Sequence, residues 1–588
     1  MSQAGSVRST FLGRIALLWV GPVLLLFGSP AAFSDEPCQA AAVWTAPQQV
    51  SFENILRDVD KQSSQPNFTV FIELPDGSAA DIDPGSVRLN DLPALDHPSS
   101  VGDNNGNGVP DRMVKFNRGS LITTTGPVTI TGLKTTNGCF TGDTGVEIQC
   151  LPSGVQRADD WVDYTTSNMP DPALNGRAAK LEVHRVEPVF PPSCHITPIR
   201  AVVLVHALST PAPAAFDLQF KDYSLMETLA MRGIRTFTFN HLGFGHSAFV
   251  SGWNPLDDPC NASLPQCSAA QCASGPIAGV CDCSSLNPLY KRDQQGSTAY
   301  LRPNPLPAYC PHTSSVNFQF ITHQLEQLDL VVDYARAETG LEKIHLLAWS
   351  LGGSTIGKYL GEYPGGQQKV AAAVFLAPTF GGLGNPTSTW PLGLINRADT
   401  LNVFNLAGPT CAAGDGCTSG CPVADPDCAT GLAGCPGQKD PEIEDPIWTA
   451  TTALDPVGPG WGPPDGLSRY PVVPRFGWVQ AVAEKIEVPA LLINGLKDSV
   501  VPVNQSVNLW SVSPPQDPPV ACTSDADCAT GYACRPFPTP QCRLNSRTLV
   551  QLNCASHGLH WETCSGEGCV DPHLTVQKLV RNFILTGR

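Results

Sequence analysis

The sequence predicts an α/β fold, a mostly parallel sheet with helices on both faces, preceded by a small all-β sandwich domain. From about residue 200 onward, apolar strand-like runs alternate with helical runs, which is the pattern of a parallel sheet. Before that point, short β-prone runs are separated by Pro-Asp-Gly and Asp-Pro-Gly turns, a spacing typical of a β-sandwich. A chain of 588 residues is long enough to form both domains.

The first residues have the composition of an export signal. Arg8 and Arg14 precede an apolar run over 15–27, and small residues follow, which predicts a secretory signal peptide over 1–34. The run is shorter than the roughly 18 to 20 residues that span a membrane, and no later segment is long and apolar enough. The 22 cysteines crowd into Gly-, Pro- and Asp-rich stretches, as expected of disulfides formed in an oxidising compartment. We therefore expect a secreted protein (extracellular, cell-surface or periplasmic) without a transmembrane segment.

The overall charge argues against one class of partner. The formal net charge is −17, and the chain contains no run of basic residues. Nucleic-acid binding depends on a basic patch or stripe. We therefore expect no nucleic-acid partner, and we interpret the acidity as a contribution to solubility.

The all-β domain is expected over residues 67–150, and one of its loops has the pattern of a calcium site. Oxygen-bearing side chains alternate along this loop and are followed by Gly, as calcium loops require. The candidate ligands are Asp103, Asn105, Asn107, Val109 and Asp111. The loop resembles the calcium loops of dockerin and thrombospondin type 3 repeats, which implies a structural calcium. An EF-hand would have Glu where this chain has Val114. The alternative is a hairpin turn without metal, because Asn-Gly-rich stretches commonly form such turns.

A linker is expected over residues 151–179, followed by the α/β domain over 180–588. Pro-, Gly- and Cys-rich insertions interrupt this domain at about 250–313, 380–475 and 520–543. The last insertion contains four cysteines in a short polar stretch, which predicts a small knot closed by two disulfides. Sequence alone leaves the disulfide pairing open.

The α/β domain is centred on the stretch Ile344–Ser354, which reads as a short apolar strand, a Ser between small residues and the start of a helix. A Ser exposed on a strained strand-to-helix turn needs small residues two positions before and after it, and Ala348 and Gly352 meet this need. The stretch resembles the nucleophile elbow of the α/β-hydrolase family, G-x-S-x-G, with Ala in the first small position. The resemblance implies that Ser350 is a nucleophile and that the domain has the α/β-hydrolase fold.

Other parts of the chain match the same family in the same order. A buried-type strand ends at residues 206–208, a place at which the family has a loop that donates a backbone N–H to an oxyanion. The resemblance therefore implies an oxyanion hole formed by the N–H of Leu351 and that of Ala207 or Leu208. Farther along, Asp498 follows a strand and precedes Val-Val-Pro, as the family's acid does, and His557 comes late in the chain, as its base does.

Ser350, Asp498 and His557 also make chemical sense as a set. A Ser hydroxyl is a poor nucleophile at neutral pH, so an imidazole must accept its proton, and a buried carboxylate must hold the imidazole in the right tautomer. His560 is an alternative base. We favour His557 because it follows the preceding strand more closely and lies between small residues.

These residues predict a secreted serine hydrolase that cleaves a carboxylic ester through an acyl-enzyme, without a cofactor for catalysis. In this family an insertion like 380–475 forms a lid, and its aromatic residues favour a lipid or other apolar acyl ester as substrate. An acyltransferase would use the same three residues. The alternative from another class is a non-catalytic surface or adhesion protein with an inert hydrolase fold.

Overall fold

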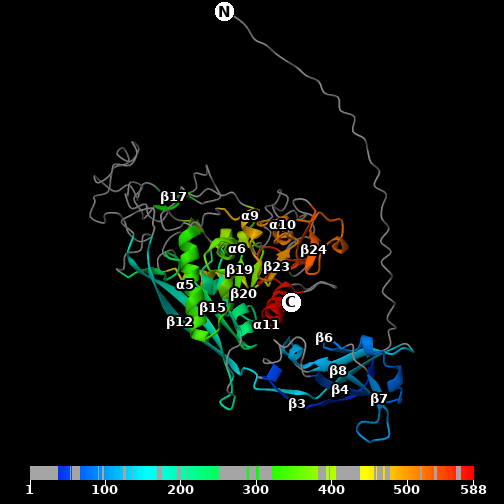
Figure 1. The fold of residues 1–588 in the computed structure, drawn as a ribbon. Coiled ribbons are helices and arrows are strands. Elements are labelled where there is room, and N and C mark those ends of the chain that lie inside the picture. Colours follow the sequence, from blue (N-terminus) through cyan, green and yellow to red (C-terminus); the bar gives the residue numbers. More distant parts are fainter. Residues whose placement is uncertain are drawn as a thin grey trace, which may run out of the picture.

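The computed structural model describes residues 38–587 with gaps, and Figure 1 shows two bodies, a smaller β-rich domain and a larger α/β domain. The gaps are 53, 56–66, 91, 96–98, 124–127, 137, 168–174, 195, 197–199, 208–209, 251–287, 291–299, 304–320, 382–392, 396, 405–437, 456–458, 460–465, 467, 471–476, 517–518, 536–539 and 564–570. The predicted signal peptide, 1–34, lies outside the described residues. Within the described part of the chain, no helix is long and apolar enough to span a membrane.

The smaller domain is a β-sandwich, as the turn spacing predicts. One sheet has the order β1 (Gln39–Ala40), β10 (Cys139–Asp143), β9 (Thr129–Leu133), β5 (Arg88–Leu89) and β6 (Leu92–Pro93). The other has the order β2 (Ala42–Ala46), β4 (Asn67–Glu73), β8 (Asp111–Asn117) and β7 (Ser100–Gly102), and β3 (Gln49–Ser51) pairs with β11 (Glu147–Gln149). Alternate residues of the strands point inward, so that Phe68 of β4 and Phe140 of β10 share one core.

The sandwich begins earlier than the expected boundary at residue 67. Strand β2 pairs with β4 along its whole length, and Trp44 stacks on Phe71 at 5.5 Å between ring centroids. A disulfide joins Cys38 to Cys139. The N-terminal strands escape sequence analysis because they are only two to five residues long, too short to show a period.

The larger domain is built on a nine-stranded, mostly parallel sheet, which confirms the predicted α/β class. The main path runs β12 (Gly154–Thr165), β13 (Ala178–Val189), β15 (Ile234–Phe239), β14 (Arg200–Val205), β19 (Ile344–Trp349), β20 (Val370–Leu376), β23 (Ala490–Gly495) and β26 (Arg547–Leu552); β16 (Ala248–Phe249) pairs with β13. The β12–β13 and β13–β15 pairs are antiparallel, and every later pair along the path is parallel.

The expected linker over 151–179 is wrong, because it contains the first strand of this sheet. Strands β12 and β13 pair in continuous register from Gly154 with Val189 to Thr165 with Ala178. Strand β12 lies at the sheet edge and leaves most of its side chains exposed or half-buried. Its mixed polarity therefore hides it, since an edge strand lacks the continuous apolar run of a central one.

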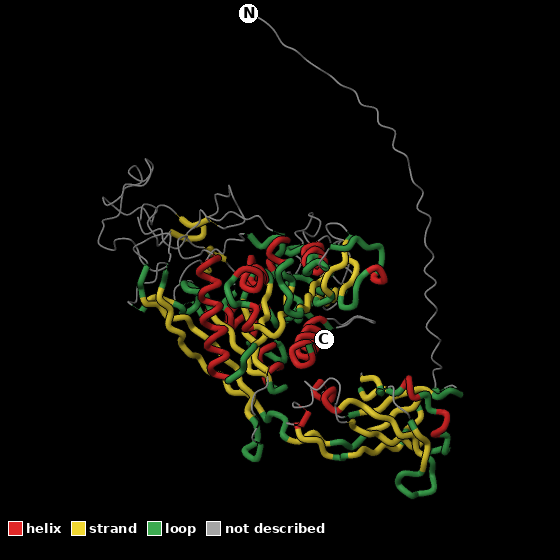
Figure 2. Tube along the Cα trace, in the orientation of Figure 1, coloured by secondary structure: helices red, strands yellow, loops and turns green. Residues whose placement is uncertain are grey.

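Helices cover both faces of the sheet, as predicted (Figure 2). One face packs on α3 (Leu225–Ala230) and α11 (Pro572–Thr586), and the other packs on α5 (Ile321–Thr339), α6 (Gly352–Glu362), α9 (Gln480–Ala483) and α10 (Val503–Ser511). Strand β14 shows the division, because Val202 and Leu204 join the first core, whereas Val203 and Val205 join the second. The first core continues into the sandwich, toward which α11 is turned (Figure 1).

The Cys-rich insertions are described to different extents. Most of 250–313 lies outside the described residues, apart from the hairpin β17 (Pro288–Tyr290) and β18 (Tyr300–Pro303). Of 380–475, the structure describes β21 (Gly393–Ile395), α7 (Arg397–Val403), α8 (Glu444–Ala453) and β22 (Ser468–Tyr470), and the lid interpretation stays a prediction. The two-disulfide knot is confirmed, with bonds Cys522–Cys534 and Cys528–Cys542 around the hairpin β24 (Tyr532–Arg535) and β25 (Gln541–Leu544).

We expect Gly495→Ala to destabilise the larger domain, because a methyl group there would overlap the carbonyl oxygen of Ala555. The contact is with backbone, which cannot rotate away. Overpacking of this kind costs about 1–3 kcal/mol, so the melting temperature should fall by roughly 2–10 °C. Gly154→Ala is the matched control, since its added methyl group would meet nothing within 4 Å. Equal melting temperatures for the two variants in scanning calorimetry would contradict the prediction.

Candidate active site

Ser350 lies at the turn between β19 and α6, with a left-handed backbone (φ +53°). A non-glycine residue rarely adopts this conformation unless its surroundings impose it. Here the N–H of Ser350 donates to the carbonyl of Leu376 (2.8 Å), and its own carbonyl accepts from the N–H of Thr379 (3.1 Å). The end of the neighbouring strand β20 and the residues just after it thus hold both sides of the turn and present the Ser side chain at the carboxyl end of the sheet.

The small residues around Ser350 are required by close backbone approach. A methyl group at Gly352 would lie 2.5 Å from the carbonyl oxygen of Val205 at the end of β14. Ala348 is fully buried between neighbouring strands, where its methyl group is accommodated. The turn therefore tolerates Ala at the first small position and demands Gly at the second.

The structure brings Ser350, His557 and Asp498 together in one hydrogen-bonded line. The Oγ of Ser350 lies 2.9 Å from Nε2 of His557, and Nδ1 of the same imidazole lies 2.9 Å from Oδ2 of Asp498. The Asp498 side chain is fully buried, and its Oδ1 accepts from the N–H groups of Val500 (2.9 Å) and Val501 (2.7 Å). These bonds fix the carboxylate so that its other oxygen faces the imidazole.

Trp349, the last residue of β19, holds the His557 loop in place, a role that sequence reasoning missed. Its indole N–H donates to the carbonyl oxygen of His557 at 2.9 Å. The indole is fully buried against the rings of Phe404 and Trp561. Trp349 occupies the variable position of the elbow motif, so no local signal marks it.

His560, the alternative base, points away from Ser350. Its Nε2–H donates to the carbonyl of Ala215 at 3.0 Å, and its ring packs edge-on against Trp349. Burial lowers the pKa of His560 to about 3, so this imidazole stays neutral. Its position is that of a core residue.

The described part of the oxyanion region fits a role for the Leu351 N–H. Leu351 precedes the first turn of α6, where backbone N–H groups have no partner within the helix, and no described acceptor takes this one. Ala207 is the second residue after β14, the strand beside β19, whereas Leu208 lies outside the described residues. His206 is buried, and burial lowers its pKa to about 4, while its Nδ1–H donates to the Ala207 carbonyl (2.6 Å). This neutral imidazole shapes the loop.

The calcium-like loop joins β7 to β8 and gains one residue that sequence reasoning missed. The Asp103 carboxylate accepts from the N–H groups of Asn107 (3.0 Å) and Gly108 (2.9 Å). Glu73 faces Asp111 across the β4–β8 pair, and its Oε2 lies 2.8 Å from Nδ2 of Asn107. Glu73 is remote in sequence, so only the strand register could reveal it.

The loop carries oxygen donors of the kind that calcium takes, but its carboxylates are not gathered around one point, because Asp103, Asp111 and Glu73 do not offer three oxygens within 4.8 Å of one another. Three carboxylates now border it, those of Asp103, Asp111 and Glu73, together with the amides of Asn105 and Asn107. The main-chain carbonyl of Val109 completes the predicted set. Oxygen donors in this number are what Ca²⁺ prefers.

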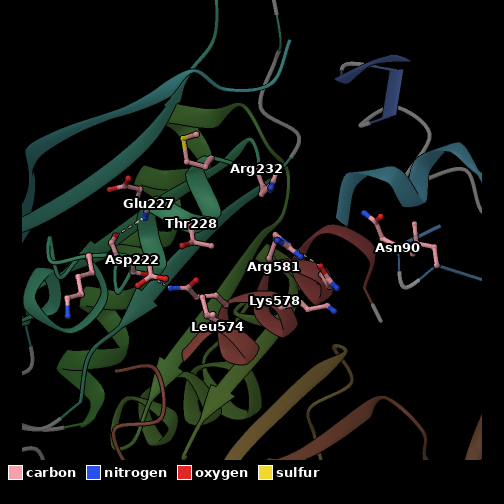
Figure 3. Close-up of a pocket in the computed structure, with 14 residues that line it drawn as sticks. Asn90, Asp222, Glu227, Thr228, Arg232, Leu574, Lys578 and Arg581 are labelled. Carbon is pink, nitrogen blue, oxygen red and sulfur yellow. Dashed lines mark hydrogen bonds between the residues drawn. The ribbon is translucent and has the colours of Figure 1, made fainter. Parts of the chain in front are cut away.

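Two cavities bordered by described residues lie away from Ser350. One, of about 680 Å³, lies between the sandwich and the α/β domain, with Asn90 on one side and α3 and α11 on the other (Figure 3). Arg232 and Arg581 both border it, and burial lowers the pKa of each. The other, of about 610 Å³, is bordered by His184, Asp217 and α8. Ser350, His557 and Asp498 line neither of them.

Comparisons with known proteins agree with the topology. The family model described as "alpha/beta hydrolase fold" matches residues 200–401, which include β14, β19, the Ser350 turn and β20. No curated protein sequence matches the chain.

Similar solved structures include three whose descriptions name an enzyme. A putative aryl esterase from Burkholderia cenocepacia is 13% identical with a TM-score of 0.35, over 72% of this chain and 100% of that one. A thioesterase domain from the curacin biosynthetic pathway is 10% identical with a TM-score of 0.34, over 73% and 100%. The monoacylglycerol lipase of Paleococcus ferrophilus is 14% identical with a TM-score of 0.30, over 67% and 96%. The family match and the strand order together show that the larger domain has the α/β-hydrolase fold.

Proposed function

We propose that this protein is an exported serine hydrolase that cleaves a carboxylic ester through an acyl-enzyme. The single observation that carries the proposal is the line of hydrogen bonds from Asp498 through His557 to Ser350. Ser350 itself lies at a strained turn of the α/β-hydrolase fold. A Ser, an imidazole and a buried carboxylate in this relation are the parts that acyl transfer needs.

We assign a role to each group on the basis of these hydrogen bonds. As the Oγ of Ser350 attacks the ester carbonyl, its proton moves to Nε2 of His557, and Asp498 stabilises the imidazolium through Nδ1–H. The Leu351 N–H would donate to the oxygen that becomes negative, a contribution worth roughly 3–4 kcal/mol of the barrier. The imidazolium then protonates the departing alcohol, and water, activated by the same imidazole, hydrolyses the acyl-enzyme.

The substrate class that we propose is an ester of an apolar acid. The support is the position of insertion 380–475, whose helix α8 packs on α2 (Ala212–Phe216), the helix that follows the loop at Ala207. The aromatic residues of the insertion support it less. Trp448 is buried within the protein, and Trp390 and Trp461 lie outside the described residues.

Export and a structural calcium are parts of the same proposal. Disulfides in both domains, Cys38–Cys139 and Cys522–Cys534 among them, suit an oxidising compartment. We propose that the loop at Asp103 holds Ca²⁺ as a stabilising ion, with Glu73 as an additional ligand. The metal has no part in the ester chemistry, since Ser350 belongs to the other domain.

We expect a fluorophosphonate probe to label the wild-type protein and not Ser350→Ala, because phosphonylation needs an activated Ser Oγ. The wild type should also hydrolyse a p-nitrophenyl ester. Folded wild-type protein that resists labelling would instead support the non-catalytic reading. An added alcohol that takes the acyl group in preference to water would identify an acyltransferase.

We expect His557→Ala and Asp498→Asn to lower kcat for the same ester by on the order of 10³–10⁴-fold, with circular dichroism unchanged. His560→Ala should keep kcat within about tenfold of wild type, because His560 donates only to the Ala215 carbonyl. An inactive His560→Ala beside an active His557→Ala would show that the base is misassigned.

We expect millimolar Ca²⁺ to raise the melting temperature of the chelator-treated protein by roughly 5 °C, because a ligand that binds only the folded state stabilises it. Asp103→Asn and Glu73→Gln should each reduce this shift, since each removes a charged oxygen donor. Mg²⁺, which has a stricter geometry, serves as the control ion. A melting temperature that is the same with chelator and with Ca²⁺ would remove the metal from the proposal.

A further inference from the structure

A second buried carboxylate, that of Glu562, lies beside the candidate active site and has no part in the mechanism above. Glu562 is completely buried. Its Oε2 accepts from the N–H of Ser556 at 2.7 Å, and its Oε1 accepts from the Ser556 hydroxyl. Both carboxylate oxygens are thus bound to the residue that immediately precedes His557.

Burying the carboxyl group of Glu562 costs free energy, which its hydrogen bonds offset only in part. Burial raises the pKa of Glu562 to about 7, while the hydrogen bonds from Ser556 and Gln438 act in the opposite direction. A buried carboxyl group is destabilising relative to an apolar side chain of the same shape unless its oxygens are satisfied. The structural consequence of these hydrogen bonds is that the Ser556 peptide group has a fixed orientation.

Ser556 also contacts the insertion 380–475, at the two residues between which the structure does not describe the chain. The Ser556 hydroxyl lies 3.3 Å from the carbonyl oxygen of Phe404 and 3.4 Å from Nε2 of Gln438. Thr563, next to Glu562, donates its N–H to the Gln438 carbonyl at 2.9 Å. Phe404 and Gln438 are the residues that flank the undescribed stretch 405–437. Both flanks of that stretch therefore touch the loop that carries His557.

The anchors of this loop differ in kind. Trp349 holds the His557 carbonyl, and close packing on Gly495 limits the position of Ala555; both are contacts with the rigid sheet. Glu562 instead ties Ser556 to Gln438 of the insertion. Together with the direct contacts of the Ser556 hydroxyl to Phe404 and Gln438, this anchor links the His557 loop to a segment outside the sheet.

We propose that Glu562 is a positioning residue, which holds His557 within reach of Ser350 by fixing Ser556 and couples this position to the insertion through Gln438. The inference rests on the proposed function, because it presumes that Ser350 and His557 react together. Glu562 makes no described hydrogen bond to Ser350 or Asp498, so it acts through the loop and, when ionised, also through charge repulsion with the Asp498 carboxylate.

The test is a comparison of Glu562→Gln, Ser556→Ala and the double variant. An amide keeps the size of Glu562 but presents an N–H₂ group to one of the Ser556 donors. We expect kcat for ester hydrolysis, and the rate of fluorophosphonate labelling, to fall about 10- to 100-fold in Glu562→Gln with KM within about twofold, since small misplacements of catalytic groups have effects of this size. Ser556→Ala should lose less, because its N–H remains.

The double variant distinguishes a shared route from two separate effects. If Glu562 acts through Ser556, the double variant should be no slower than Glu562→Gln alone, whereas independent effects would multiply. If the insertion is coupled to the position of His557, Gln438→Ala should also lower the labelling rate. Glu484→Gln is the matched control. Glu484 forms an ion pair with Arg543 (2.8 Å between the charged atoms) and lies away from the site, so this variant should leave kcat and the labelling rate unchanged.

The outcomes separate the two proposals. Wild-type protein that is labelled, together with Glu562→Gln that is labelled at the wild-type rate, overturns the positioning role and leaves the hydrolase intact. Wild-type protein that is never labelled overturns both. If Glu562→Gln does not fold, Ser556→Ala decides, since it keeps the buried carboxylate and removes one of the two hydrogen bonds that Ser556 donates to it. An unchanged labelling rate would then contradict the positioning role.

Discussion

The left-handed backbone at Ser350 is the constraint on which the rest of the α/β domain depends. A turn of this kind costs on the order of 1–3 kcal/mol and persists only where its surroundings impose it. Leu376 at the end of strand β20 and Thr379 just after it impose it here, and Gly352 lets β14 approach within contact distance. The strained residue is thus fixed by three parallel strands, which together place its Oγ at their carboxyl edge.

The same edge explains how distant residues converge. Strands β23 and β26 are parallel neighbours in register up to Gly495 and Leu552, and Asp498 and His557 each follow their own strand by a short turn. Their separation is therefore set by the spacing of adjacent strands. A two-disulfide knot can lie between them in sequence without disturbing it, because the cost of a longer loop grows only slowly with its length.

The sequence reveals residues whose type and neighbours are dictated locally. Ser350 with its small flanks, Asp498 after its strand and the late His557 are predictable because each occupies a short turn with its own chemistry. The long parallel strands are predictable from their continuous apolar runs. The order of strands in the sheet, and the pairing Cys522–Cys534 with Cys528–Cys542, depends on contacts that no local pattern encodes.

What escapes the sequence are roles created by distant contacts. Strand β12 is hidden because an edge strand carries polar residues, and Glu73 matters only because the register places it opposite Asp111. Trp349 and Glu562 share this property, since each acts on the His557 loop through a backbone atom, the carbonyl of His557 in one case and the N–H of Ser556 in the other. Backbone partners leave no complementary side-chain signature in the sequence. The motif around His557 predicts an imidazole at this place, whereas the residues that hold the imidazole there emerge only from the fold.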